Sequence, residues 1–163
     1  MDFAVIIKTL PVLLKGCVMT IELTVITLCI GTAFGIILAL LRISKNKLLN
    51  LIAGFYIWIF RGTPLLLQLF FFYYGLPFVG ITLSPFWAAV LGLGLNCSAY
   101  MAEIIRGGII SIDIGQFEAS KALGFTYIDT MRKVILPQTF KVIIPPVGNE
   151  FIRSEERRVG KEC

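Results

Sequence analysis

Long apolar runs separated by short polar segments make up most of this chain. Residues 16–41 contain a single charged residue, Glu22, and residues 62–102 contain none. A bilayer core of about 30 Å is crossed by about 20 helical residues. The first run therefore has the length of one membrane span. The second has room for two, separated by a turn at the glycines and prolines of "GLPFVGITLSPF", residues 75–86.

Composition places the chain among membrane proteins. Hydrophobic residues account for 57% of the 163, mean hydropathy is +0.87, and only 15% of residues are charged, whereas a soluble domain carries more charge. We therefore predict an all-α integral membrane protein. Its three complete spans and the beginning of a fourth are expected at residues 16–41, 51–74, 85–105 and 139–152.

The boundaries of the first two spans need separate comment. We expect residues 3–14 to form an interfacial lead-in on the outer side of the membrane. Arg61 lies inside the second span, so it marks either a helix break or the cytosolic half of a longer helix. The pattern of residues leaves both readings open.

The lysines and arginines predict how the spans are oriented. "RISKNK", residues 42–47, carries three bases and no acid, and more bases follow the third span, at Arg106, Lys121, Arg132, Lys133 and Lys141. The link between the second and third spans is uncharged. Because basic loops stay in the cytoplasm, we predict an outer N-terminus and a cytosolic segment at residues 106–133. The net charge of +5 is therefore a topology signal, and nucleic-acid binding is not expected.

The inventory of reactive residues argues against chemistry in this chain. It has no histidine, and its cysteines, at positions 17, 29, 97 and 163, lack metal-type or CxxC spacing. No phosphate-binding G-x-x-x-x-G-K-[ST] motif occurs. We predict no catalytic residue, no metal site and no cofactor. "GTAFG", residues 31–35, matches the G-x-x-x-G pattern that lets a neighbouring helix approach closely.

A polar segment at residues 111–137 interrupts the apolar pattern, and two short helices are predicted within it. The first covers residues 116–123 and ends at Gly124. Thr126 then begins the second, with Asp129 in capping-box position, and Pro137 interrupts it. Periodicity alone leaves this helix pair, a solvated loop and an amphipathic element on the membrane surface as alternatives.

Two motifs in and after this segment carry a family resemblance. "EASKALG", residues 118–124, followed after nine residues by "VILP", residues 134–137, resembles the EAA signature of ABC importer permeases. Ser120 replaces the second alanine of the signature, and Val134 replaces its isoleucine. "FRGTPLLLQLFFFYYGLP", residues 60–77, and the stretch from "SAYMAE" onward are similar to the polar amino-acid uptake branch of that superfamily. The resemblance spans residues 10–152.

The resemblance implies a fold of five spans and a motor on a partner subunit. In that family the helix–Gly–helix element docks into a groove on a cytosolic ATP-binding cassette subunit, which hydrolyses the ATP. The implied coupling residues are Gln116, Glu118, Ala119, Ser120 and Gly124. The other implied partners are a second permease copy or paralogue and an extracytoplasmic amino-acid-binding protein, at the bacterial cytoplasmic (inner) membrane.

The leading hypothesis is the permease subunit of an ATP-driven importer for polar amino acids. The alternatives are a permease for another small solute, such as an opine or cystine, or a non-ABC membrane protein, either an embedded enzyme or a passive channel. Asn96, Ser98 and Glu103 interrupt the third span and are candidates to line a substrate path. Helix–helix hydrogen bonds for the first two and an interfacial position for Glu103 explain them equally well.

The last eleven residues, "RSEERRVGKEC" at 153–163, differ from everything before them. Seven of them are charged, and they resemble the in-frame translation of a widely used sequencing adapter. We interpret residues 153–163 as a non-native tail on a C-terminally truncated permease domain, residues 1–152. A chain of this form is expected not to transport.

Overall fold

The computed structural model describes residues 3–156, and side chains for residues 9–149. The described part is helical throughout, without strands, which confirms the predicted all-α class. Its helices are α1 (Phe3–Ile43), α2 (Lys47–Gly62), α3 (Leu65–Phe70), α4 (Pro85–Ile110), α5 (Ile114–Ala122), α6 (Tyr127–Thr130) and α7 (Leu136–Glu156). A π-turn (Phe71–Gly75) and a 3-10 turn (Leu76–Val79) follow α3, and a second π-turn (Met131–Ile135) joins α6 to α7.

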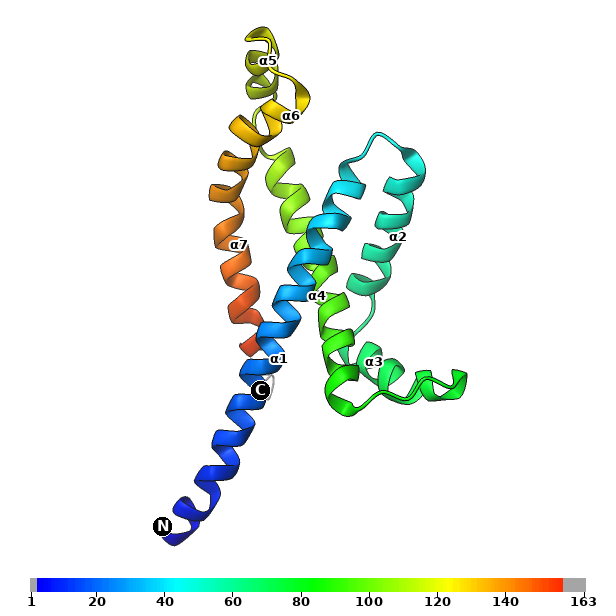
Figure 1. The fold of residues 1–163 in the computed structure, drawn as a ribbon, viewed down its shortest axis with the longest axis vertical. Coiled ribbons are helices and arrows are strands. Elements are labelled where there is room, and N and C mark those ends of the chain that lie inside the picture. Colours follow the sequence, from blue (N-terminus) through cyan, green and yellow to red (C-terminus); the bar gives the residue numbers. More distant parts are fainter. Residues whose placement is uncertain (1–2, 157–163) are drawn as a thin grey trace.

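The helices pack around α4, which lies between α1 and α7 (Figure 1). α1 and α4 run in the same direction, and α2 returns antiparallel to them. The turn between α1 and α2 therefore lies at the same end of the molecule as α5 and α6. The start of α1 and the link from α3 to α4 lie at the other end.

Small residues set the distance between α1 and α4. A Cβ atom added to Gly31 would lie 2.8 Å from Cys97 Cβ, and one added to Gly35 would lie 2.6 Å from Met101 Cβ. Both separations are too short for real side chains, so these backbones approach as only glycine permits. This confirms the prediction that "GTAFG" admits a neighbouring helix.

A small core forms where α1, α2 and α4 meet. Its buried members are Leu38, Ala39, Ala53, Ile57, Ala99 and Ala102. Outside this core, large apolar side chains face outward, including Trp58, which is 70% exposed. In water such a surface would be unstable, whereas in a bilayer lipid tails and neighbouring helices cover it.

Two helical segments are long and apolar enough to cross a membrane, Thr9–Ile43 and Pro85–Ile110. The second predicted span, residues 51–74, is wrong as a single helix, because α2 and α3 are bent by 103° at a short break and at most form one broken span. The cause is Pro64, which disfavours helical backbone at Thr63 and lacks an N–H. Of the two readings for Arg61, the nearby break is the one observed.

Other boundaries also differ from the prediction. α1 is helical from Phe3, so residues 3–14 continue the first helix, and α7 begins at Leu136 and includes residues 153–156. Residues 157–163, the rest of the interpreted tail, lie outside the described residues. The expected interruption at Pro137 is wrong. The π-turn before it, in which Leu136 N–H donates to Met131 O, lets the helix continue through the proline.

Candidate functional site

The polar segment begins with two helices, α5 and α6, at one end of the molecule (Figure 1). The first is short as predicted, whereas the second continues through the π-turn into α7. Asp113 begins α5, and its carboxylate accepts a hydrogen bond of 2.6 Å from the Gly115 N–H. This carboxylate satisfies a backbone donor that the first helical turn leaves free. We call residues 111–137 the coupling element from here on, after the role that the family resemblance implies for this segment.

A left-handed glycine ends α5 and turns the chain. Gly124 has φ +79°, its N–H donates to Lys121 O at 3.0 Å, and Phe125 N–H donates to Ser120 O at 3.0 Å. These two bonds form a Schellman motif, in which the residue after the cap adopts a conformation that favours glycine. The predicted helix stop at Gly124 is confirmed, and the turn directs α6 away from the axis of α5.

Thr126 begins α6 as predicted. Its hydroxyl oxygen accepts from the Asp129 N–H at 3.2 Å and donates its own hydrogen to the Asp129 carboxylate at 2.7 Å. The same carboxylate lies 2.8 Å from Lys133 Nζ, which also lies 5.5 Å from the centre of the Phe125 ring. The Lys133 ammonium, with the Thr126 hydroxyl, holds the pKa of Asp129 below its usual range.

The predicted coupling residues divide into an exposed group and a buried one. Gln116, Glu118 and Ala119 are exposed on α5, where a partner could reach them. Ser120 is only 3% exposed, and its hydroxyl donates to Gln116 O at 2.7 Å, so it stabilises α5 from inside the element.

Sequence reasoning missed an apolar surface on the coupling element. Leu123, Tyr127 and Ile128 are 75%, 66% and 76% exposed around the turn at Gly124. They belong to the end of α5 and to α6, which lie at the end of the molecule that also holds the turn between α1 and α2 (Figure 1). The sequence does contain a hint of this surface. Its residues flank the predicted helix stop at Gly124, so they do not fall on the continuous apolar face of one helix.

Apolar contacts and one polar contact join the coupling element to the long helices. A hollow of about 400 Å³ is lined by Ile43 of α1, Ile109 of α4, Phe117 of α5 and Tyr127 of α6. On the other side, Gln138 Nε2 of α7 donates to Gln116 Oε1 at 3.3 Å. Ile135, between α6 and α7, is fully buried. Since α5 also packs against the π-turn that leads into α7, a displacement of α5 would be passed to α7.

The break between α2 and α3 has its own polar site. The Phe60 carbonyl would normally accept from the residue four positions on, but Pro64 has no N–H to donate. Two side-chain amides replace it: Gln68 Nε2 donates to Phe60 O at 2.9 Å, and Asn96 Nδ2 donates to it at 3.0 Å. Asn96 Nδ2 also donates to Gln68 Oε1 at 3.2 Å. An unsatisfied buried carbonyl would cost about 1–3 kcal/mol, so this arrangement stabilises the break.

Ser98, two residues further along α4, joins α2 and α4 by a different contact. Its hydroxyl is fully buried, lies 2.8 Å from the Tyr56 hydroxyl and donates to Leu95 O at 2.7 Å. Tyr56 of α2 also donates to Leu95 O. The contacts of Ser98 are thus those of a helix–helix hydrogen bond. A role for it in the path stays a prediction.

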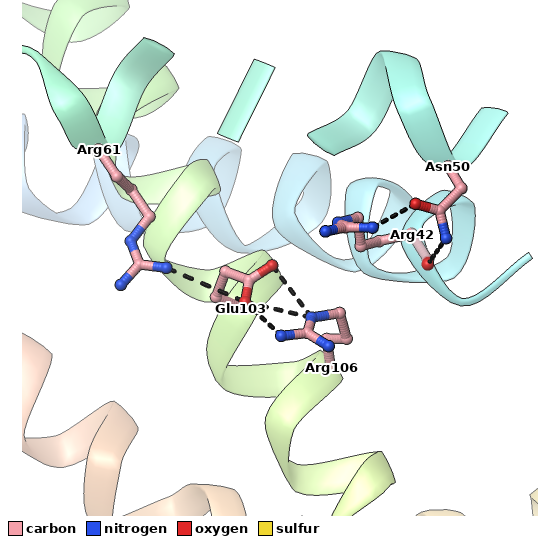
Figure 2. A network of polar contacts seen from close by, with 5 residues as sticks. All are labelled: Arg42, Asn50, Arg61, Glu103 and Arg106. Carbon is pink, nitrogen blue, oxygen red and sulfur yellow. Dashed lines mark hydrogen bonds and ion pairs between the residues drawn. The ribbon is translucent and has the colours of Figure 1, made fainter. Parts of the chain in front are cut away.

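Glu103 is surrounded by arginines from two helices (Figure 2). Its carboxylate lies 2.7 Å from Arg106 Nη2 on its own helix and 3.9 Å from Arg61 Nη1 at the end of α2. The Arg61 guanidinium also lies 5.2 Å from the centre of the Tyr100 ring. On α1, Arg42 donates to Asn50 Oδ1, and Asn50 Nδ2 donates to Arg42 O at 2.7 Å. Glu103 is therefore an interhelical ion-pair residue, 19% exposed, within α4.

The basic segments gather at one end of the fold. The turn after α1 carries Arg42, Lys45 and Lys47, and the coupling element carries Lys121, Arg132 and Lys133 (Figure 1). The uncharged link between α3 and α4 lies at the opposite end. The basic segments and the uncharged link therefore lie at opposite ends of the fold, as the predicted topology requires.

Comparison with known proteins decides the family. Residues 31–154 match the family described as "Binding-protein-dependent transport system inner membrane component". The chain belongs to this family. A crystal structure of an amino acid ABC transporter with histidines superposes on it with a TM-score of 0.89 at 44% identity, covering 96% of this chain and 73% of that one. A methionine ABC transporter in an inward-facing conformation, 23% identical with a TM-score of 0.72, shares the fold.

Curated relatives in this family are amino-acid permeases by name. The arginine transport system permease protein ArtQ of Bacillus subtilis is 46% identical over 153 residues, which are 93% of this chain and 70% of that protein. The L-cystine transport system permease protein TcyB of the same organism is 44% identical, over 87% of this chain and 61% of that protein. Against the arginine permease ArgU of Corynebacterium glutamicum, 47% identical, the chain spans 46% of the relative's length.

Proposed function

We propose that this chain forms the membrane-spanning part of the permease subunit of an ATP-driven importer for polar amino acids. The observation that carries the proposal is the coupling element. It is a capped, rigid helix pair held at the basic end of a membrane bundle, and it exposes Gln116, Glu118 and Ala119 beside an apolar surface. A channel or an embedded enzyme has no use for such an element.

The coupling element is suited to receive a cytosolic ATP-binding cassette subunit. A partner groove could accept α5 with the Glu118 carboxylate, while Leu123, Tyr127 and Ile128 supply buried apolar area. Since α5 packs against the π-turn that leads into α7 and is hydrogen-bonded to α7, closure of the ATPase would move α7 with it as a rigid body. The permease then needs no ATP site or cofactor of its own, because hydrolysis takes place on the partner.

The remaining partners follow from the same proposal. A second permease copy or paralogue would cover part of the exposed apolar faces, lipid the rest, and an extracytoplasmic binding protein would deliver the solute. The location is the bacterial inner membrane, with the N-terminus outside. The clustering of bases at one end supports this orientation. Labelling of a Lys45→Cys variant from outside intact cells would contradict it.

The substrate class is supported by the named relatives, whose amino acids include arginine and cystine. One alternative was a permease for another small solute such as cystine. The similarity to the L-cystine permease TcyB supports that alternative as well, and cystine is itself an amino acid. We propose that Asn96 contributes to the substrate path beside the helix break, because it is only partly buried in the bundle. Ser98 and Glu103 would act beside it mainly by holding α2 and α4 together.

The test uses the full-length permease expressed with its neighbouring ATPase and binding-protein genes. Co-purification with the ATPase, and ATP-dependent uptake of labelled amino acids into proteoliposomes, are expected. The double variant Glu118→Ala, Leu123→Ala should weaken ATPase binding. The control is Phe78→Ala, because Phe78 is 91% exposed but lies at the opposite end of the molecule, and this change should leave ATPase binding unaltered. A purified permease that binds no ATPase would remove the proposal.

A further inference from the structure

The chain between α3 and α4 extends sideways from the bundle, and we call residues 71–84 the arm. In Figure 1 the arm leaves α3 on the side of α4 that is away from α1 and α7, and it returns to the start of α4. The helical segment Leu65–Val79 is bent by 103° from α2, which lies antiparallel to α4. The arm therefore runs across the direction of the membrane spans, at the end of the fold opposite the coupling element.

Close packing fixes the arm to α4. Both α3 and the π-turn that begins the arm contact α4. A Cβ atom added to Gly92 of α4 would lie 2.7 Å from Leu69 Cδ2 and 3.4 Å from Phe72 Cδ2, so the side chains at the root of the arm lie directly against the α4 backbone. The root of the arm and this end of α4 therefore form one rigid unit.

The tip of the arm satisfies part of its own backbone. Gly80 has φ +84°, and its N–H donates to Pro77 O at 3.0 Å. Ile81 N–H donates to Leu76 O at 3.1 Å. These two bonds form a Schellman motif, which pairs carbonyls that the end of a helix leaves free. A turn that pairs these polar groups internally can approach the apolar part of a bilayer at a lower cost.

The side chains on the arm give it an uncharged, apolar surface. Residues 62–102, which include the whole arm, contain no charged residue. At the tip, Phe78 is 91% exposed and Val79 is 72% exposed. Two adjacent apolar side chains held this far out of the fold gain most from an apolar environment that surrounds the tip.

Three aromatic residues beside the tip combine an apolar ring with a polar group. Tyr73 and Tyr74 of the arm and Trp87 in the first turn of α4 are all exposed. Their hydroxyl and indole N–H groups have no hydrogen-bond partner among the described residues. At a membrane–water interface the rings contact acyl chains, while headgroups and water pair with the polar groups. Burial against another protein would instead require a specific partner for each polar group, so these residues favour lipid.

We propose that the arm is a membrane anchor at the boundary between lipid headgroups and acyl chains, with Phe78 and Val79 among the acyl chains. The leaflet is the one at the end of the fold opposite the coupling element. Because the arm is fixed to α4, this contact sets the depth at which that end of α4 lies in the bilayer. An anchor of this kind contacts neither the solute nor the ATPase, so it goes beyond the proposed function.

The collisions of a spin label with oxygen and with a nickel chelate measure whether the arm lies in lipid. The full-length permease–ATPase complex, with its native cysteines replaced by alanine, carries a nitroxide on Phe78→Cys in vesicles of phosphatidylethanolamine and phosphatidylglycerol. Oxygen concentrates among acyl chains, whereas Ni(II) ethylenediaminediacetate stays in water. We expect the label at position 78 to collide more often with oxygen than with the nickel chelate. The control is Lys45→Cys, an exposed site in the turn between α1 and α2, where the order should be reversed.

Two results would overturn the anchor. More frequent collision with the nickel chelate at position 78 would place the arm in water, where a binding protein could reach it. Rare collision with both reagents would place the arm inside a protein contact. A disulfide between two Phe78→Cys copies would then identify the covering protein as a second permease.

If the labelled variants do not assemble, Trp87 reports on the same surface. Trp58→Phe leaves Trp87 as the only tryptophan among residues 1–163, and any tryptophan beyond them is replaced by phenylalanine. Lipids brominated on their acyl chains are expected to remove most of the Trp87 emission, and unquenched emission would reject the anchor. Uptake of labelled amino acids by the same vesicles tests the proposed function separately, because the position of the arm does not depend on it.

Discussion

Replacement of Gly124 tests whether the shape of the coupling turn matters to transport. Its φ of +79° lies in the left-handed region, where a side chain costs about 1–2 kcal/mol. A Cβ atom added there would meet nothing within 4 Å, so the penalty is purely conformational and involves no clash. A loss of this size lowers the population of the native turn by about 5- to 30-fold relative to alternatives.

A series of variants separates backbone strain from other effects. Gly124→Asn should be mildest, because asparagine tolerates this conformation, followed by Gly124→Ala and then the β-branched Gly124→Val. Gly107→Ala is the control. Gly107 also has open space around it but lies inside α4, so alanine there should be neutral or stabilising.

The assay is the ratio of amino acid imported to ATP hydrolysed in proteoliposomes containing the full-length complex. We expect this ratio to fall in the order Asn, Ala, Val, and to stay at the wild-type value in Gly107→Ala. If Gly124 acts only as a helix cap, thermal stability will fall while the ratio stays constant. A wild-type ratio in Gly124→Val would therefore refute the coupling role.

Three further changes test the packing and the charges. Gly35→Ala should destabilise the bundle by about 1–3 kcal/mol, because its methyl group would overlap Met101; an unchanged melting temperature in detergent would contradict the packing of α1 on α4. Glu103→Gln should cost about 1 kcal/mol, since two partly exposed arginines lose their shared counter-charge, and an Arg61→Gln change in the same chain should recover part of it. Asp129 has a lowered pKa, so its ion pair stabilises the protein at pH values above the ordinary carboxyl pKa. This stabilisation is lost as the pH falls through the lowered pKa. Wild type should therefore lose melting temperature more steeply on acidification than Asp129→Asn, and parallel curves would refute this.

Local features of the sequence were sufficient for much of the fold. Uninterrupted apolar runs predict membrane helices because a helix satisfies its backbone hydrogen bonds within one segment in lipid, and α1 and α4 follow those runs. The helix stop at Gly124 and the cap at Thr126 depend on residues within one turn, so they were predictable from neighbours alone. A motif of the same short range singled out Gln116, Glu118 and Ala119, which the structure shows to be exposed on α5, and their coupling role stays a prediction.

The features that depend on distant residues were decided only by the tertiary structure. A helix break was one of two readings for Arg61, but the groups that satisfy the broken backbone are the side chains of Gln68 and of Asn96, which lies 36 residues from Phe60. Likewise the sequence offered Glu103 either for a substrate path or for an interfacial position, whereas its ion pairs with Arg106 and with Arg61 from another helix appear only in the structure (Figure 2). A sequence pattern reports which groups need partners. The packing of α2 against α4 determines which partners they find.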